Sequence, residues 1–476
     1  MRRNPGAAER TARATRRGAQ TGARTRIEKD SLGRKAVPAG AYFGIQTQRA
    51  VENFPISGLR APAVLVDAAA QIKKCAARAN AQLGRLDRRR AAAVVRACDE
   101  VLSGKFRDQF VVDIFQMGAG TSFHMNMNEV LANRAEQILG GRKGQYRIVH
   151  PNDHVNMGQS TNDVYPTAMR LAALKLLRRD LAPALRDFWR GLERKGREFA
   201  HVVKSGRTHL QDAVPIQMGQ EFAAYASAIR QASGTLERAA RGLERLGIGG
   251  TAVGTGINAD PRYAALMVRL LAAETRLPLR RAADMREAMQ SLRPFADVSA
   301  ALRNLALELT RIANDLRLLS SGPRTGLAEI SLPAVGPGSS IMPGKVNPSM
   351  LEMLNQVCFQ VVGCDLAVAA AVQAGQLELN VMMPAVAFNL LFMMGILANA
   401  LREVGARCIA GIEASVDRCR MYAETSLGLV TAVSPIIGYA AAAEVAKEAV
   451  SGGKPVIDVL RERGLLDAAT LAHLLK

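Results

Sequence analysis

The 476-residue sequence predicts an all-α protein built around a central bundle of long helices. Alanine and leucine, which favour helices, are abundant, whereas aromatic residues make up only 4% of the chain. Apolar residues recur at helical spacing over long stretches, and few stretches alternate in the manner of half-buried strands. The chain exceeds the length at which one hydrophobic core stops growing, so we expect two or three domains besides any tail.

The expected domains differ in composition. Residues 1–25 carry seven arginines and a single acid, with almost no apolar residue other than alanine, which predicts a disordered basic arm. Residues 26–160 are predicted to form a mainly helical N-terminal domain, residues 161–416 a central helical bundle, and residues 417–476 a small helical C-terminal domain. The arm is rich in arginine like a transit peptide, but it lacks an apolar face and has little serine, so we expect a cytoplasmic protein.

Helical spacing of apolar residues places the long elements in order. It predicts two antiparallel helices within residues 62–104, further helices at 169–199, 213–244 and 285–321, and two strongly apolar helices at 351–372 and 385–401. The last could be mistaken for a membrane span, but Pro384 precedes it and Asn389 and Asn399 interrupt it. We therefore interpret it as a helix buried on all sides in a bundle, and we expect no association with a membrane.

The chain is strongly basic, with a formal net charge of +21. Such a charge raises the possibility of a basic, non-catalytic protein that binds nucleic acid. The arginines are scattered through helical segments, however, without aromatic residues placed for base stacking and without a nucleic-acid-binding motif. We interpret them as solvated helix faces, whose field also attracts anionic substrates, and we expect no nucleic acid partner.

Neither a metal nor a cofactor is expected. The six cysteines include no Cys-x-x-Cys pair, and several lie in apolar helical segments, which indicates reduced, buried thiols. His150 and His154 stand four residues apart, but the residues between them, which include Pro151, predict a loop. No His-Glu-x-x-His motif occurs.

Four polar segments separate the predicted helices, at residues 118–129, 150–163, 205–212 and 247–258. In the first, Thr121 lies at a glycine-rich turn where its hydroxyl can donate a hydrogen bond. In the second, Ser160, Thr161 and Asn162 are placed to cap a helix that begins near Pro166, although capping alone would also explain them. The fourth contains Gly-x-Gly-x-x-Ala without a preceding strand, so we interpret it as a close-packed break between helices.

Residues 338–348, which we call the reactive loop, read Gly-Ser-Ser-Ile-Met-Pro-Gly-Lys-Val-Asn-Pro. Gly338 and Gly344 permit backbone angles that other residues avoid. Asn347 is predicted to be the N-cap of the next helix, with Pro348 at its first position. The positive end of that helix and the Lys345 ammonium together suit a carboxylate or a phosphate. A P-loop is excluded because five residues separate Gly338 from Gly344, and Val346 follows the lysine.

This loop resembles the signature of the aspartase/fumarase superfamily, whose members eliminate ammonia, water or a larger amine from succinyl compounds to give fumarate. The resemblance extends from about residue 26 to the C-terminus and includes residues 40–54 and 205–212. It implies three domains and a homotetramer with a twenty-helix core, in which three subunits build each active site. Active sites shared between subunits would also bring together polar segments that lie, within one subunit, at opposite ends of helices about 45 Å long.

The resemblance also implies roles for individual residues around the substrate's reacting carbon. Ser339 matches the catalytic base, which acts as an alkoxide on the proton of Cβ. The charge then spreads into the neighbouring carboxylate as an aci form, which concentrated hydrogen-bond donors stabilise. The residues that match the binders of this β-carboxylate are Thr121, Ser160, Thr161 and Ser340.

Other matching residues serve the opposite end of the substrate. Lys345 and Asn347 match the residues that bind the α-carboxylate. Thr208 and His209 match a pair near the leaving amine, and Asn162 matches a residue that contacts the amine. Glu352 matches the carboxylate that partners the histidine.

Within the superfamily, the sequence looks like an aspartate ammonia-lyase acting on L-aspartate and fumarate. Gln-Ser-Thr-Asn-Asp at 159–163 and Ser-Met-Leu-Glu at 349–352 favour this over a class II fumarase, which remains the alternative together with other lyases of the same fold. Three residues depart from the usual pattern beside the implied site: His124 replaces asparagine, Met157 replaces a frequent lysine, and Met383 replaces a charged residue.

Overall fold

The computed structural model describes residues 24–467 and 470, so the predicted arm at 1–25 lies almost wholly outside the described residues. The described chain is mainly helical, as predicted. It divides into two compact units: residues 24–172, 244–292 and 371–388 form the first, and residues 173–243, 293–370 and 389 onward form the second. The predicted boundaries at residues 160 and 416 stay predictions.

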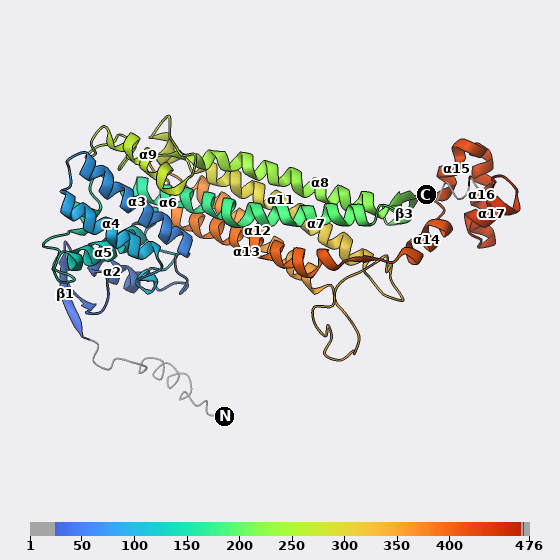
Figure 1. Cartoon of the computed structure of the whole chain (residues 1–476), viewed down its shortest axis with the longest axis horizontal. Coiled ribbons are helices and arrows are strands. Elements are labelled where there is room, and N and C mark those ends of the chain that lie inside the picture. The colour runs from blue at the N-terminus through green and yellow to red at the C-terminus, as the bar shows by residue number, and fades with distance from the viewer. Residues whose placement is uncertain (1–23, 468–469, 471–476) are drawn as a thin grey trace, which may run out of the picture. The chain divides into compact units, whose positions relative to one another are not determined.

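The first unit combines helices with short paired strands (Figure 1). Its elements are β1 (Thr25–Asp30), β2 (Gly33–Pro38), α2 (Ile45–Asn53), α3 (Ala63–Gln82), α4 (Arg88–Leu102), α5 (Thr121–Ile138), the start of α6 (Thr161–Leu176), β5 (Arg245–Leu246), α9 (Tyr263–Thr275), β6 (Arg280–Arg281) and α10 (Glu287–Gln290). Helices α3 and α4 confirm the predicted pair, and α3 also packs against α9. The hairpin of β1 and β2 was not predicted.

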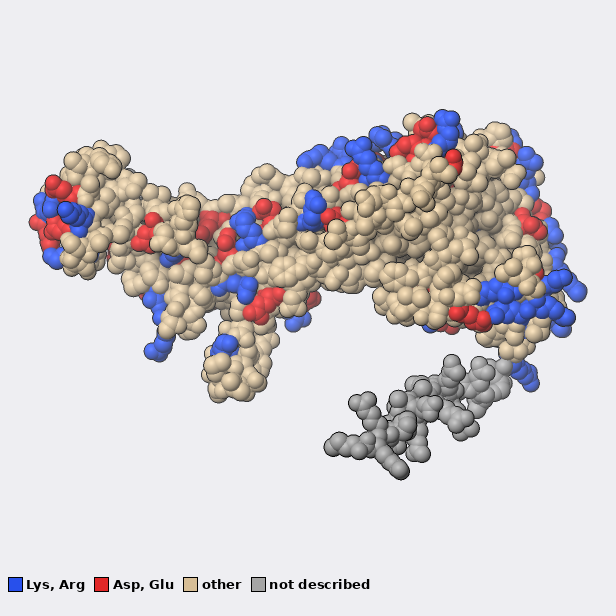
Figure 2. All heavy atoms as spheres, turned by 180° about the vertical axis from the view of Figure 1, so that it is seen from behind, with Lys and Arg blue, Asp and Glu red and all other residues tan. Residues whose placement is uncertain are grey.

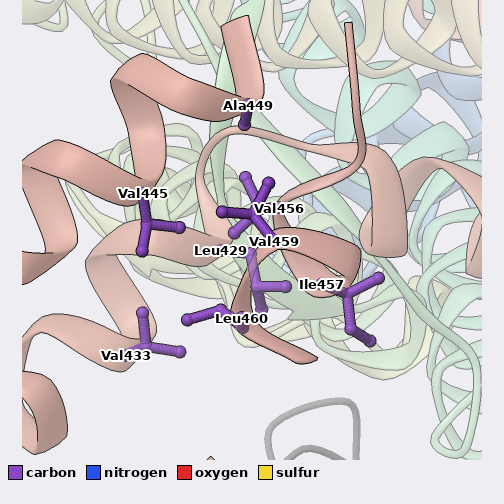
Figure 3. Packing of buried hydrophobic residues seen from close by; sticks show 8 residues of the cluster. All are labelled: Leu429, Val433, Val445, Ala449, Val456, Ile457, Val459 and Leu460. Carbon is purple, nitrogen blue, oxygen red and sulfur yellow. The ribbon is translucent and has the colours of Figure 1, made fainter. Parts of the chain in front are cut away.

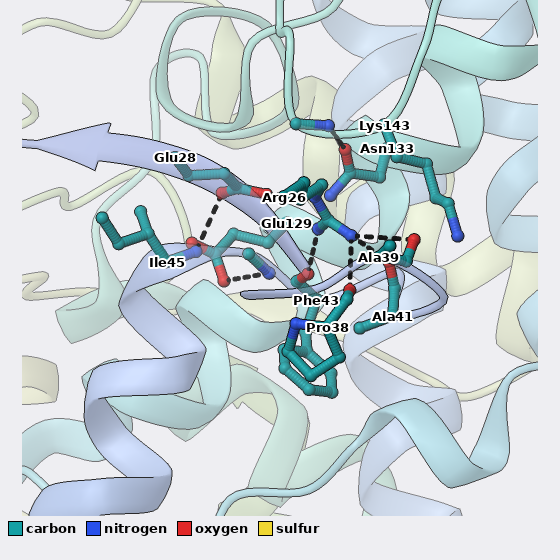
Figure 4. A network of polar contacts seen from close by, with 12 residues as sticks. Arg26, Glu28, Pro38, Ala39, Ala41, Phe43, Ile45, Glu129, Asn133 and Lys143 are labelled. Carbon is teal, nitrogen blue, oxygen red and sulfur yellow. Dashed lines mark hydrogen bonds and ion pairs between the residues drawn. The ribbon is translucent and has the colours of Figure 1, made fainter. Parts of the chain in front are cut away.

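A buried carboxylate organises the beginning of this unit. Glu129 of α5 is 1% exposed and accepts hydrogen bonds from the backbone N–H groups of Gly44, Gln46 and Thr47, at 2.8–3.1 Å, and from the Thr47 hydroxyl at 2.6 Å. These groups form the start of α2, where unpaired N–H groups favour an anion. Nearby, the Arg26 guanidinium pairs with Glu28 and donates to backbone carbonyls (Figure 4).

The second unit contains the long helices (Figure 1). Its elements are α7 (Ala182–Glu198), β3 (Val203–Thr208), β4 (Gln211–Gln217), α8 (Met218–Ala240), α11 (Arg293–Leu319), β7 (Ile330–Ser331), most of α12 (Ser349–Gln373) and α13 (Met383–Arg407), β8 (Glu413–Ala414), α14 (Val416–Thr425), α15 (Leu429–Ile437), α16 (Tyr439–Gly452) and α17 (Val456–Glu462). Helix α8 packs against α7 and α11.

Close contact between α7 and α8 depends on small residues. A Cβ atom added to Gly219 would lie 2.3 Å from the carbonyl oxygen of Gly196. Along α11, buried apolar residues recur every three or four positions, as an amphipathic helix requires. Its polar side chains bind α12, because the Ser299 hydroxyl donates to Asp365 at 2.6 Å and Arg303 pairs with the same carboxylate.

The C-terminal helices share a cluster of buried apolar residues. Eight buried apolar residues of α15, α16 and α17 form one cluster (Figure 3), namely Leu429, Val433, Val445, Ala449, Val456, Ile457, Val459 and Leu460. Aliphatic side chains fill this cluster, in keeping with the low aromatic content of the sequence.

The predicted starts of α6 and α8 were wrong. Helix α6 begins at Thr161 and not near Pro166, which lies inside it. Proline removes only one backbone hydrogen bond, and the Asp163 carboxylate stabilises the first turn by accepting from the Ser160 N–H. Residues 213–217 belong to β4, so α8 begins at Met218. Residues 151–155 form one π-helical turn where a loop was predicted.

Two helices, Ser349–Gln373 and the segment 383–411, are apolar and long enough to cross a membrane by composition alone. This is weak evidence, since core helices of soluble proteins have the same character. The window in the second helix is 61% buried inside the structure, whereas that in the first is 39% buried. The interpretation of 385–401 as a helix buried on all sides is confirmed only in part, because most of its residues are buried but Phe392 is 40% exposed.

The charged residues of each unit form many ion pairs. On the face shown in Figure 2, lysine and arginine side chains lie on several elements and stand beside acidic ones. Examples are Lys74 with Glu274, Arg134 with Glu100, and Arg463 with Glu448. The six cysteines are free and buried, as the sequence indicated.

A buried ion-pair network in the second unit should contribute strongly to stability. Glu329 is fully buried and pairs with Lys204 at 2.8 Å and Arg207 at 2.7 Å, and Lys204 is itself 2% exposed. The substitution Glu329→Gln removes the carboxylate that Arg207 binds and leaves the buried Lys204 with Glu221 alone, so we expect it to lower the free energy of unfolding by about 3 kcal/mol or more.

Urea denaturation followed by circular dichroism measures this effect. Glu198→Gln is the matched control, because Glu198 pairs with Lys195 while its side chain is half exposed. That variant should lose no more than about 1 kcal/mol. Equal midpoints for the two variants would contradict a dominant role for the buried network.

Candidate active site

The first polar segment places Thr121 at the start of α5. Its hydroxyl donates to the carbonyl of Gly118 at 3.3 Å, and the preceding turn contains Ala119 and Gly120, both with positive φ. Thr121 also lines a cavity of about 390 Å³ within the first unit, together with residues of β1, α2 and the turn at 150–152. Thr121 therefore borders a space that a small ligand could enter.

The second and fourth polar segments meet at one buried carboxylate. Asp163, which is 0% exposed, accepts from the N–H groups of Ser160, Gly249 and Thr251 at 2.9–3.0 Å. Burial is the largest influence on Asp163 and raises its pKa to about 6, while these hydrogen bonds oppose the shift. Gly249 packs against Ala264, which supports the prediction of a close-packed break between helices at 247–258.

This anchor orients three of the candidate residues at the beginning of α6. The Ser160 hydroxyl accepts from the N–H of Asn162 at 3.2 Å, and the Asn162 side-chain amide donates to the carbonyl of Ala252 at 2.8 Å. The Thr161 hydroxyl lies 2.7 Å from Nδ1 of His124, one turn beyond Thr121 on α5. The structure thus brings Thr161 close to the helix that carries Thr121.

In the second unit, the reactive loop surrounds the Ser339 oxygen with backbone donors. The Ser339 hydroxyl oxygen accepts from the N–H groups of Ile341 at 3.3 Å and Met342 at 3.0 Å. Ser340 and Lys345 are exposed. Donors directed at this oxygen favour its ionised form, because a hydrogen bond to an anion stabilises it.

The ends of the loop are tied together. The Asn347 side-chain amide donates to the carbonyl of Gly338 at 2.5 Å. Gly338 has φ +75°, and a Cβ atom there would lie 2.0 Å from the carbonyl oxygen of Lys345, so only glycine fits. The predicted cap was wrong by one residue, because α12 begins at Ser349 and the Glu352 N–H donates to the carbonyl of Pro348.

The third polar segment is a β-hairpin, although the sequence analysis predicted no strand there. Thr208 pairs with Gln211, and His209 and Leu210 form the two-residue turn with φ +55° and +60°. The hairpin exposes Thr208 and His209. Arg207, directly before them, binds Glu329 at 2.7 Å, which fixes the part of the hairpin next to its turn to the chain segment that precedes the reactive loop.

The candidate residues are divided between the two units. Thr121, Ser160, Thr161 and Asn162 belong to the first, whereas Thr208, His209, Ser339, Ser340, Lys345, Asn347 and Glu352 belong to the second. Glu352 is half-buried in the first turn of α12. The hydrogen bonds of residues 24–467 include none that joins Glu352 to His209.

Sequence reasoning missed the groups that hold these residues in place. Asp163 and Glu329 are buried acids whose partners, apart from Ser160, are distant in sequence, so spacing gives little signal. The Asn-Asp pair at 162–163 could have suggested a capping acid. Sequence reasoning also missed Lys73, whose ammonium lies 2.6 Å from Nε2 of His124. Among the described residues, no group of three or more His, Cys, Asp or Glu could hold a metal ion.

Comparison with known proteins finds two family models that together match most of the chain. The family model described as lyase matches residues 33–363, and the model described as fumarase C C-terminus matches residues 429–476. An aspartate ammonia-lyase from Pseudomonas aeruginosa is 50% identical over 456 residues, which is 95% of this chain and 96% of that protein.

Two further relatives show the breadth of the family. A protein named fumarate hydratase class II 2, from Bradyrhizobium diazoefficiens, is 46% identical over 93% of this chain and 94% of its own length. The crystal structure of a fumarate lyase:delta crystallin from Brucella melitensis, bound to cobalt, is 51% identical with a TM-score of 0.92, covering 95% of this chain and 98% of that one. The chain therefore belongs to the lyase family that includes aspartate ammonia-lyases and class II fumarate hydratases.

Proposed function

We propose that this protein is an aspartate ammonia-lyase that reversibly eliminates ammonia from L-aspartate to give fumarate. The observation that carries the proposal is the 50% identity to an aspartate ammonia-lyase over nearly the whole of both chains. The geometry of the reactive loop supports it, because two backbone N–H groups point at the Ser339 oxygen.

The mechanism begins with Ser339 as an alkoxide that removes the proton from Cβ of L-aspartate. A serine hydroxyl is a poor base, so its anion needs stabilisation, which the N–H groups of Ile341 and Met342 and the nearby Lys345 ammonium supply. The electron pair released from the C–H bond spreads into the β-carboxylate as an aci form. Hydroxyl donors from Thr121, Ser160, Thr161 and Ser340 stabilise that dianion.

Collapse of the aci intermediate forms the double bond and expels the amine as ammonia. Lys345 and Asn347 hold the α-carboxylate during this step. Thr208, His209 and Asn162 lie near the leaving amine, and Glu352 partners the imidazole. The exposed position of His209 at the tip of a hairpin, with Thr208 beside it, supports a role in contacting a ligand.

We further propose a cytoplasmic homotetramer in which three subunits build each active site. Helix α12 supports this proposal, because it leaves large apolar side chains uncovered: Phe359 is 61% exposed and Leu366 is 72% exposed. A soluble protein rarely exposes such a face, which a second copy of the chain would bury. A groove on α8 and α11, lined mainly by alanines and polar side chains, offers a second contact surface.

A class II fumarase is the alternative, which the 46% identity to a fumarate hydratase favours. The two activities share fumarate as product and differ in whether ammonia or water leaves. The residues that contact the leaving group therefore discriminate between them, and the substrate test is direct. A basic protein that binds nucleic acid without catalysis is a more remote alternative.

Ser339→Ala should abolish fumarate formation from L-aspartate, since a positioned base contributes about a hundredfold to ten-thousandfold. Fumarate is followed by its ultraviolet absorbance with L-aspartate and, separately, with L-malate. The control is Ser451→Ala, an exposed serine of α16, which should retain wild-type activity. Fumarate formed from L-malate alone would establish a fumarase instead. No fumarate from either substrate would contradict both proposed activities.

Leu366→Asp should dissociate the tetramer and abolish activity together, because a charge on the apolar face of α12 cannot be buried without a partner. Light scattering after size-exclusion chromatography gives the oligomeric state, and circular dichroism checks folding. Tyr439→Asp is the control, since Tyr439 is 84% exposed on α16, away from that face. A folded, fully active Leu366→Asp monomer would disprove shared sites.

A further inference from the structure

Lys73 of α3 is a buried cation whose three possible donors all have acceptors. It is 0% exposed, and its ammonium nitrogen lies 2.6 Å from Nε2 of His124, 2.9 Å from Oδ1 of Asn156 and 2.9 Å from Oε1 of Gln159. An ammonium group has three N–H donors and no acceptor. The site therefore matches a protonated lysine.

The side-chain amides of Asn156 and Gln159 cannot rotate by 180° to present their nitrogens to Lys73. The Asn156 amide nitrogen donates to the carbonyl of Gln159 at 3.2 Å, and the Gln159 amide nitrogen donates to the carbonyls of Val155 and Met157, both at 3.1 Å. These contacts fix the orientation of each amide from its nitrogen side. Their oxygens must face Lys73 and accept from it.

His124 connects Lys73 to Thr161. It is 2% exposed, its Nε2 faces Lys73, and its Nδ1 lies 2.7 Å from the Thr161 hydroxyl oxygen. Burial, and secondarily the charge of Lys73, hold the pKa of His124 well below its usual value, so the imidazole is neutral. A neutral imidazole has one donor nitrogen and one acceptor nitrogen.

The direction of the proton chain follows from these contacts. A protonated Lys73 donates to Nε2, so the proton of the imidazole resides on Nδ1. Nδ1–H then donates to the Thr161 oxygen, and the hydroxyl proton of Thr161 must point elsewhere. We propose that Lys73 and His124 are positioning residues that direct the Thr161 hydroxyl proton toward the substrate carboxylate. The inference rests on the proposed function, in which Thr161 binds the β-carboxylate.

Loss of the Lys73 proton would reverse the chain without breaking any contact. A neutral amine still donates to the two amide oxygens, and its lone pair accepts from Nε2–H. Nδ1 then accepts from the Thr161 hydroxyl, whose lone pairs would face and repel the carboxylate. The protonation state of Lys73 thus decides whether Thr161 attracts or repels the substrate.

The surroundings of Lys73 set where this change occurs. Burial lowers the pKa of Lys73 to about 7, and the carboxylate of Asp163 on α6 opposes that shift. Cys98 on α4 also faces Lys73, but burial raises its pKa, so it remains a neutral thiol. On α9, burial raises the pKa of Tyr263 as well, and Glu274 pairs with Lys74 instead. The folded pKa is lowered, so the productive orientation is present below it and lost as the pH rises through it.

Bound substrate should shift this titration upward, because an added carboxylate stabilises the ammonium. The loss with rising pH is therefore expected in kcat/KM, which reports the free enzyme, at lower pH than in kcat. Thr161→Val lacks the hydroxyl, so its kcat/KM should no longer fall as the pH rises through the pKa of Lys73. If kcat/KM of Thr161→Val fell with rising pH as much as that of the wild type, the inference would be overturned. This comparison leaves the buried contact between Lys73 and His124 intact.

A double-mutant cycle tests the route through Thr161. Thr161→Val should lower kcat/KM for L-aspartate by about a hundredfold, as for loss of one donor at a developing charge. His124→Phe keeps an aromatic ring at this position and removes both imidazole nitrogens. It should lower kcat/KM about tenfold, and by no more than Thr161→Val does. In the Thr161→Val background it should have no further effect. His201→Phe, at an exposed histidine, is the control.

The outcomes separate this inference from the proposed function. If wild-type enzyme makes fumarate and Thr161→Val is impaired while His124→Phe is not, the proposed function stands and the inference fails. Independent, multiplicative losses in the double variant would also overturn it. Unimpaired Thr161→Val would remove Thr161 from the proposed site and the inference with it.

Discussion

The candidate site depends on carboxylates that have been taken out of water. A buried carboxylate is tolerated only when several donors surround it, and in this chain most of those donors are backbone N–H groups of turns. Glu129 binds the start of α2, and Asp163 joins the start of α6 to the glycine-rich turn at 249–251. Glu329 instead binds two cations of β3. Each acid fixes a segment that helical packing alone would leave free.

This constraint explains why sequence reasoning located the polar segments but not their anchors. Helix positions follow from apolar spacing, which is local, so α3, α4 and the apolar helices α12 and α13 could be predicted. The hairpin at 203–217 was missed because its turn, His209–Leu210, lacks the glycine or asparagine that signals a hairpin. Lys73 binds partners 51 to 86 residues away, and Asp163 binds the turn 86 to 88 residues away, which no local pattern reveals.

The candidate residues themselves were found through a motif, not through geometry. The reactive loop could be singled out because Gly338 and the serines are unusual between two helices, and the structure gives a physical reason for that glycine. The position of Asn347 as a donor to Gly338 could not be predicted, because a capping asparagine and a loop-closing one look alike in sequence. His124 stood out as a departure, and only its contacts give that departure a meaning.

The hairpin tip places two demands on residue 209 that different amino acids satisfy best. A left-handed backbone costs a residue with a side chain roughly 1–2 kcal/mol relative to a relaxed conformation, and both turn residues pay it here. Glycine would suit the backbone, but only histidine supplies an imidazole. Local strain of this kind persists where the surroundings enforce it. Under the proposed function, in which His209 lies near the leaving amine, this turn accepts backbone strain in order to present an imidazole, and the ion pairs of Lys204 and Arg207 with Glu329 hold the strand that leads into it.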